Sequence, residues 1–266
     1  DDPMTGEPLP ARVLVRAVDP GGPDPEFAAE PGASGPRYSL CTVDGETTTP
    51  ISPGRYRVIA TRGIEYTIDE RLVELAPGAA LRVELRIERV VDTRGWISAD
   101  LHLHAAPSPD SFVSLEERVA SLACAGIEVG VATDHNRVTD YAPAIRRLGL
   151  DRWLSSIVGD EVTTSGTRRF GHFNAFPLRR KPDEPAEGAV PYHDIEPRAI
   201  FDLARGSGAR ILQVNHPRMA PQLGYFDLVD HDAMTAQTAD PAYDPRYDAI
   251  EVFNGLWLSD VRLVER

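Results

Sequence analysis

Side chains that bind metal ions recur in this chain at the ends of apolar, strand-like runs. His102 and His104 close the run at 96–101. Because side chains at i and i+2 of a strand point to the same face, both imidazoles can reach one metal ion. Alone, a His-x-His at a strand end is a weak signal, but further clusters follow other apolar runs, at 133–136, 159–161 and 214–217. A polar site assembled from several strand ends is typical of a βα barrel.

Composition limits the classes of function. The chain has 266 residues, of which 42% are apolar, so it can bury a large core without disulfides. Acidic residues outnumber basic ones, 41 to 28, which gives a net charge of −13 and disfavours binding to nucleic acid or anionic membranes. No apolar run is long enough to span a bilayer. A small anionic or ester substrate remains compatible, because a bound metal ion dominates the local charge. The composition does not define an oligomeric state.

The two cysteines and the first residues bear on the cellular compartment. Cys41 and Cys124 fall in regions of different character, so two buried free thiols are favoured over a disulfide. The sequence starts without an initiator Met, as it does after removal of a leader or after trimming. The first alternative favours a secreted or periplasmic protein over a cytoplasmic one.

Residues 1–92 are predicted to form a small all-β, sandwich-like domain. Alternating runs at 11–18, 55–60 and 81–87 are separated by loops and by Pro-Gly turns at 53–54 and 77–78. The pattern loosely resembles carboxypeptidase-regulatory-like or transthyretin-like modules. No cluster of titratable groups stands out in this part, which indicates a scaffold or docking domain.

Residues 93–266 alternate between strand and helix patterns, which predicts an α/β fold with a mainly parallel sheet. Ser114 and Glu117 match a capping box at a helix start, and Gly126 ends that helix. Helices are expected at 114–122, 142–148 and 197–205. Strands are expected at 96–104, 128–133, 157–158, 169–178, 210–215 and 248–254.

The ordered motifs H-x-H, T-D-H-N, G-D-E, G-H-F-N and N-H-P resemble those of the PHP (polymerase and histidinol phosphatase) family, and their wording is similar to its CehA/McbA-like branch. The resemblance runs from Trp96 to the C-terminus, and the joint set is more specific than any single member. It implies a distorted (β/α)7 barrel that binds two or three divalent metal ions. It also implies hydrolysis of phosphoesters or related esters.

The resemblance assigns the ligands by position. His102 and His104 match ligands of a first metal, and Glu161 matches a carboxylate that bridges the first and second. The remaining matches are His172 and His216 on the second metal, and Asp110 and His135 on a third. Neutral imidazoles with a bridging carboxylate suit Zn²⁺, Mn²⁺ or Fe²⁺ better than Ca²⁺.

Other polar residues near these motifs have less specific roles. Asp134 and Asp160 would point to the opposite strand face from their neighbours, so support or a backbone hydrogen bond is expected rather than metal binding. Arg218 is predicted to act in catalysis beside Glu161 by gripping an anionic group, with a plain salt bridge as its alternative. Candidate pocket groups are Asn174 and Asn254, and expected surface residues are His193 and His231.

The chain departs from the PHP pattern at its end. These proteins close their motif set with an Asp-x-His that completes the first and third metal sites, and none occurs after Asp248. The 171 residues from Trp96 to Arg266 (266 − 95) are short for a closed barrel, which needs about 200 or more. A barrel incomplete at the C-terminus, as in a fragment or in a product of cleavage during purification or crystallisation, is favoured over a naturally shortened variant. The missing motif is expected beyond Arg266. The second metal site is then expected to be fuller than the third.

The expected chemistry is attack by a metal-activated hydroxide on phosphorus or carbonyl carbon. No G-x-S-x-G or other arrangement for a covalent nucleophile is evident. Two alternatives remain: a metal-binding but inactive PHP-like protein that interacts through its β domain, and an amidohydrolase-type enzyme that cleaves C–N bonds. A lysine bridging two metals would favour the latter, but the chain's single lysine, Lys181, lies in a Pro-rich stretch.

Overall fold

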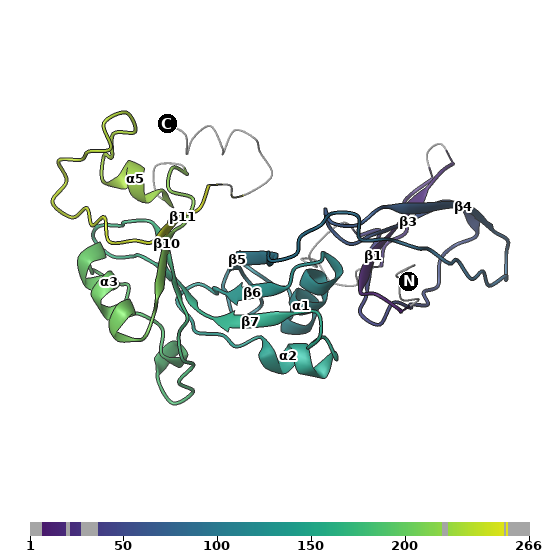
Figure 1. The fold of residues 1–266 in the computed structure, drawn as a ribbon, viewed down its shortest axis with the longest axis horizontal. Coiled ribbons are helices and arrows are strands. Elements are labelled where there is room, and N and C mark those ends of the chain that lie inside the picture. Colours follow the sequence, from purple (N-terminus) through teal and green to yellow (C-terminus); the bar gives the residue numbers. More distant parts are fainter. Residues whose placement is uncertain (1–6, 20–21, 28–36, 220–222, 253, 255–266) are drawn as a thin grey trace. The chain divides into compact units, whose positions relative to one another are not determined.

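The structure is a computed structural model that describes residues 7–19, 22–27, 37–219, 223–252 and 254 (Figure 1). The chain divides into two compact units, each built from several stretches of sequence. The first unit comprises Asp1–Asp100, Asp110–Gly130 and Tyr141–Ser156, and the second comprises Leu101–Pro109, Val131–Asp140 and Ile157–Arg266. The division expected from the sequence, 1–92 and 93–266, follows the linear chain and stays a prediction.

The first unit contains an antiparallel sheet with the strand order β2-β1-β3-β4. Side chains alternate along β3, so that Tyr56, Val58 and Ala60 are buried while their neighbours face outward. This alternation confirms the strands expected at 11–18 and 55–60. The strands are β1 (Ala11–Ala17), β2 (Ser39–Thr42), β3 (Gly54–Thr61) and β4 (Asp69–Leu75).

The strand expected at 81–87 is wrong as a hydrogen-bonded strand. Three of its apolar residues pack inward, namely Val83, Leu85 and Ile87, the last of which is 2% exposed. Leu81 is exposed, and the segment forms no ladder with β4. The amides of Arg86 and Glu88 bond to the side chains of Asp69 and Thr67 instead of to backbone carbonyls. Short polar side chains thus replace the ladder, a competition that alternation alone does not reveal.

Two helices of the first unit follow the sequence signals closely. α1 (Leu115–Cys124) begins with the expected capping box, in which Ser114 Oγ accepts from Glu117 N and the Glu117 carboxylate accepts from Ser114 N. Gly126, with φ +77°, follows its end as predicted. α2 (Ala142–Arg147) ends close to the expected residue. α1 packs on α2, β1 and β2, which places its apolar face against the sheet.

A second sheet has the order β5-β6-β7, and the later residues of each strand belong to the second unit. In this sheet β6 leads to His135, while β5 contains His102 and stops just before His104. The Thr133 hydroxyl donates to the Leu103 carbonyl and also accepts from the Leu103 amide, which fixes the two strand ends together. The strands are β5 (Ala99–Leu103), β6 (Val129–Ala132) and β7 (Ser155–Val158).

The second unit contains a sheet with the order β11-β10-β9-β8, in which only the β10–β11 pair is parallel. The expectation of a mainly parallel sheet is wrong here, because the connection from β8 to β9 is too short for a crossover helix. The strands are β8 (Asp160–Thr163), β9 (His172–Phe176), β10 (Ile211–Val214) and β11 (Ala249–Ile250).

Helix α3 (Pro197–Gly206) covers one face of this sheet, where Ile200 and Phe201 join a core that includes Phe173 and Val214 (Figure 1). Its proline lies in the first turn, as expected. The other helical turns are η1 (Pro185–Glu187) and α5 (Tyr225–Leu228).

The architecture is therefore mixed α/β, with several sheets and few helices. Within the described residues the strands do not close into a barrel. Over the same residues, no helix has both the length and the apolar character needed to cross a membrane.

Candidate metal centre

Histidine and glutamate side chains of the second unit, located in or shortly after five strands, come together in one place. β5 presents His102 and then His104, and β9 begins with His172. Glu161 does not follow a strand end, as the sequence suggested, but lies inside β8, and a parallel bridge joins it to His135. His216 follows the end of β10. These residues all belong to the same compact unit.

Gly159 explains how Glu161 reaches this position. It separates β7 from β8, so the chain leaves one sheet and enters the other at this residue. A Cβ at Gly159 would lie 3.0 Å from the Ala132 carbonyl oxygen and 3.1 Å from that of Ala175. Only glycine fits between these two backbones without displacing one of them.

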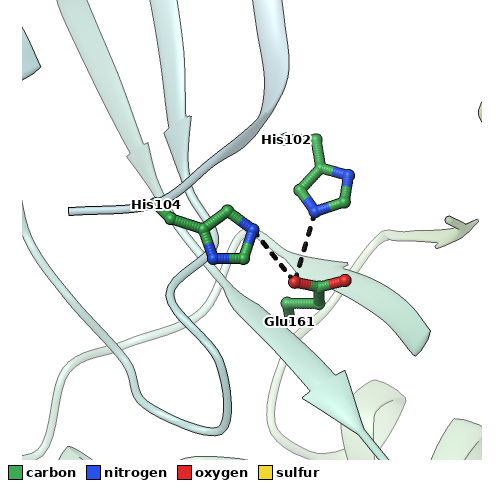
Figure 2. A group of neighbouring side chains, drawn as sticks. All are labelled: His102, His104 and Glu161. Carbon is green, nitrogen blue, oxygen red and sulfur yellow. Dashed lines mark ion pairs between the residues drawn. The ribbon is translucent and has the colours of Figure 1, made fainter. Parts of the chain in front are cut away.

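One oxygen of the Glu161 carboxylate faces three imidazoles. Glu161 Oε2 lies 3.2 Å from His102 Nε2 and 3.1 Å from His104 Nε2 (Figure 2). His135 Nδ1 is 3.0 Å from the same oxygen. Three nitrogen atoms therefore converge on a single carboxylate oxygen.

The other oxygen faces a second pair of histidines. Glu161 Oε1 lies 3.1 Å from His172 Nδ1 and 3.6 Å from His216 Nε2. Asn215 Nδ2 donates to the same oxygen at 2.9 Å. The two oxygens thus divide the imidazoles into two sets, which is the arrangement of a carboxylate able to bridge two cations.

The imidazoles form a closed circuit around this carboxylate. Neighbouring ring centroids are 4.5–5.9 Å apart, and side-chain exposure is only 9–18%. We call this group the histidine cluster; in circuit order it consists of His102, His104, His135, His172 and His216.

Two buried atoms of the centre make no contact with hydrogen-bond geometry among the described residues: His216 Nδ1, and Glu161 Oε2 despite the three imidazole nitrogens within 3.2 Å of it. Leaving a buried polar atom unsatisfied costs about 1–3 kcal/mol, so such an atom calls for an explanation. A cation next to Glu161 Oε2 would explain that atom, because the lone pairs of the oxygen and of the nearby imidazole nitrogens are directed at the same space. The donor set of imidazole nitrogens and a carboxylate can hold a metal ion.

The electrostatics of the centre follow from these contacts. Burial alone would raise the pKa of Glu161, but contacts with His102, His104 and the other imidazoles outweigh burial and lower its pKa well below the usual value. Burial alone would lower the pKa of His102, yet contacts with Glu161 and Glu251 raise its pKa to about 10. Without a metal ion, a proton therefore occupies His102 at neutral pH, and a cation must displace it.

Neighbouring side chains orient the imidazoles, and the sequence did not identify most of them. His102 Nδ1 is 2.9 Å from Glu251 Oε1, and His104 Nδ1 is 3.0 Å from Ser108 Oγ. His135 Nδ1 also contacts Thr163 Oγ1. For Glu251, the one signal that the sequence offered was its position in the last expected strand, 248–254.

The buried carboxylates beside the centre behave as expected from strand alternation. Asp134 Oδ1 accepts from Ala105 N at 2.7 Å, and Asp160 Oδ2 accepts from Val190 N at 2.8 Å. Both carboxylates therefore hold loops in place. Burial raises the pKa of Asp160 to about 7.

The two candidate asparagines lie close to the centre. Asn174 accepts from Asn215 at 2.7 Å and donates to the Leu101 carbonyl oxygen at 2.8 Å. Asn254 Nδ2 donates to Glu251 at 2.9 Å and lies 3.3 Å from His102 Nδ1. Asn174 therefore supports Asn215, which contacts Glu161. Asn254 supports Glu251, which contacts His102.

The described contacts of the Arg218 guanidinium are with residues other than Glu161. The Arg218 guanidinium pairs with Asp227 at 3.1 Å and donates to the His231 carbonyl oxygen at 2.7 Å. Asp110 is exposed and belongs to the first unit, so its ligand role stays a prediction, as does the substrate role of Arg218. His193 is exposed, as expected, whereas His231 is partly buried and stacks on Phe226.

No protein-family model matches the chain, and a search of curated proteins finds no match either. The geometry and chemistry of the centre therefore give the best indication of function. The PHP resemblance seen in the motifs remains an expectation.

Proposed function

We propose that this protein is a metal-dependent hydrolase of phosphoesters or related esters, as the PHP-like motifs imply. The observation that supports this best is the division of the Glu161 carboxylate between two sets of imidazoles. A carboxylate shared in this way can keep two cations close together despite their repulsion, and a pair of close metal ions is what two-metal hydrolases use.

The proposed ligands of the first ion are His102, His104 and Glu161 Oε2. Those of the second are His172, His216 and Glu161 Oε1. His135 is proposed for a third ion with Asp110, although its Nδ1 also faces Glu161 Oε2. Zn²⁺, Mn²⁺ and Fe²⁺ are the ions that suit such donors.

Divalent ions at these positions would supply an activated water molecule and stabilise negative charge on the reacting oxygen. The residues of the chain prepare the place for them. Glu161 stays ionised, since the imidazoles lower its pKa. Asn215 donates to Glu161 Oε1 and so fixes the plane of the carboxylate. The low exposure of the cluster limits competition from bulk water.

We also propose the finer fold expected from the motifs, namely that the strands around the cluster belong to a distorted (β/α)7 barrel. We further propose that residues 1–92 form a sandwich-like domain. Histidine and glutamate side chains that come together from several strands support the proposal of a barrel.

Activity should depend on Glu161. The Glu161→Gln variant keeps the shape of the side chain but removes its negative charge, so it should bind less metal and lose most turnover. The assay is hydrolysis of bis-p-nitrophenyl phosphate and p-nitrophenyl acetate with Zn²⁺, Mn²⁺ or Fe²⁺ present. The matched control is Glu184→Gln, an exposed glutamate paired with Lys181.

The outcomes separate the alternatives. Turnover of either ester by the parent protein, lost in Glu161→Gln and kept in Glu184→Gln, supports the proposal. Bound metal with no ester turnover would favour the inactive interaction protein. Cleavage of amide substrates alone would favour the amidohydrolase reading. Equal turnover in Glu161→Gln and the parent would refute the role of Glu161.

A further inference from the structure

Glu251 lies directly beside the turn that holds His216. Strand β11 runs parallel to β10, with Ile250 opposite Val214. The Glu251 amide donates to the Val214 carbonyl oxygen at 2.9 Å, which continues this pairing by one residue. Because the two strands end at the same edge, the Glu251 side chain emerges where the chain turns into His216.

The Glu251 carboxylate contacts two members of the histidine cluster from outside. Its Oε1 lies 2.9 Å from His102 Nδ1. Its Oε2 accepts from the His216 backbone amide at 2.7 Å and from Asn254 Nδ2 at 2.9 Å. One carboxylate therefore connects a histidine that faces Glu161 Oε2 with a histidine that faces Glu161 Oε1.

We propose that Glu251 is a positioning residue for metal binding, which fixes the tautomer of His102 and the backbone of His216. This inference rests on the proposed metal centre. In neutral His102, a proton on Nδ1 donated to Glu251 leaves the Nε2 lone pair free, and Nε2 is the atom that faces Glu161 Oε2 at 3.2 Å. A carboxylate behind a metal-binding imidazole has this orienting effect and increases the basicity of the ligand nitrogen.

The contact with His216 has a different physical basis. His216 adopts φ +26°, in the left-handed region that residues other than glycine rarely occupy. Its amide hydrogen bond to Glu251 helps to hold that backbone conformation. If the bond is lost, the backbone can relax, and His216 Nε2 moves away from Glu161 Oε1.

Replacing Glu251 by glutamine tests this directly, because the side chain keeps its size but loses one acceptor. If the new NH₂ group faces His102, it opposes the Nδ1–H tautomer. If it faces His216 and Asn254, it meets two donors. We expect Glu251→Gln to weaken Zn²⁺ binding by about 10- to 100-fold, measured by competition with a chromophoric chelator. The Co²⁺-substituted variant should also show a changed d–d absorption spectrum.

Two controls make the result specific. Glu184→Gln should bind Zn²⁺ like the parent, and Glu251→Asp, which keeps the acceptor pattern on a shorter arm, should fall between the parent and Glu251→Gln. If Glu251→Gln does not fold by circular dichroism, Glu251→Asp and Asn254→Ala provide the test, each with an expected loss of at least a few-fold.

The inference is overturned if the parent binds Zn²⁺ and the folded Glu251 variants bind it equally well with an unchanged Co²⁺ spectrum. The metal centre itself would then still stand. A parent protein that binds no Zn²⁺, Mn²⁺ or Fe²⁺ would instead refute the proposed function.

Discussion

At the scale of single residues, the centre is organised by one buried carboxylate. Glu161 is fully buried, and such a charge is costly unless it is paired. Five imidazoles surround it, three at one oxygen and two at the other. Imidazole nitrogens and a carboxylate gathered this closely could hold a metal ion, which is the physical reason to regard the cluster as a candidate metal site.

The raised pKa of His102 predicts a pH dependence. Because its folded-state pKa is about 10 against an ordinary value of 6.5, its contacts stabilise the metal-free protein fully below about pH 6.5. This stabilisation is lost as the pH rises through about 10. At pH 7 a metal ion must displace the proton, so Zn²⁺ binding should release at least one proton. Calorimetry in two buffers of different ionisation enthalpy measures this number, and a value of zero would contradict the protonation assigned to His102.

The two cysteines should differ in reactivity. Both are free, but Cys41 is exposed whereas Cys124 is fully buried, which corrects the expectation of two buried thiols. Hydrogen bonding from Cys124, helped by Arg12, lowers the pKa of Cys41 to about 7, while the Cys41 contact and burial raise the pKa of Cys124. We expect one fast-reacting thiol per chain with a disulfide reagent at pH 7.5. The fast phase should vanish in Cys41→Ser; its persistence there would show that another thiol reacts.

At the scale of secondary-structure elements, local signals predicted the start and end of α1 and the proline in the first turn of α3. These features depend on residues a few positions apart, so the sequence contains them fully. The ligand types could also be predicted, because strand alternation places His102 and His104 on one face. What the sequence did not reveal was the partner of each strand, since pairing depends on distant residues.

Strand β8 illustrates this limit. The sequence predicted a strand end before Glu161, whereas Gly159 separates β7 from β8 and Glu161 lies within β8, in another sheet. In the same way, Glu251 is 149 residues from His102, and nothing local links the two. The orienting contacts of the centre are therefore its least predictable part.

The close approach of two backbones to Gly159 provides a prediction for the element scale. Gly159→Ala places a methyl group about 3 Å from two backbone carbonyl oxygens, so it should destabilise the fold by about 1–3 kcal/mol and displace Glu161. Urea unfolding and Zn²⁺ affinity measure the two effects. The matched control is Gly206→Ala in α3, where the new Cβ meets nothing within 4 Å. Helix propensity should make that change neutral or stabilising. Equal stability of the two variants would contradict the packing described at Gly159.

At the scale of the whole molecule, metal binding should be coupled to folding. The proposed ligands come from separate strands between residues 102 and 216, so the unfolded chain does not hold them together. An ion that binds only the folded state stabilises it by about 2.7 kcal/mol at a free concentration 100 times its Kd. We therefore expect Zn²⁺ to raise the melting temperature of the parent protein and a chelator to reverse the shift. Glu161→Gln should show a much smaller shift, and an equal shift in both proteins would place the stabilising ion elsewhere.

The most direct test of the metal centre is anomalous X-ray diffraction from crystals of the protein grown with Zn²⁺. The ligand assignment predicts an anomalous peak beside Glu161 Oε2, at about 2.0–2.2 Å from Nε2 of His102 and His104. A second peak is expected beside Glu161 Oε1, near His172 and His216. Crystals with bound Zn²⁺ at other sites but none within the histidine cluster would contradict the account.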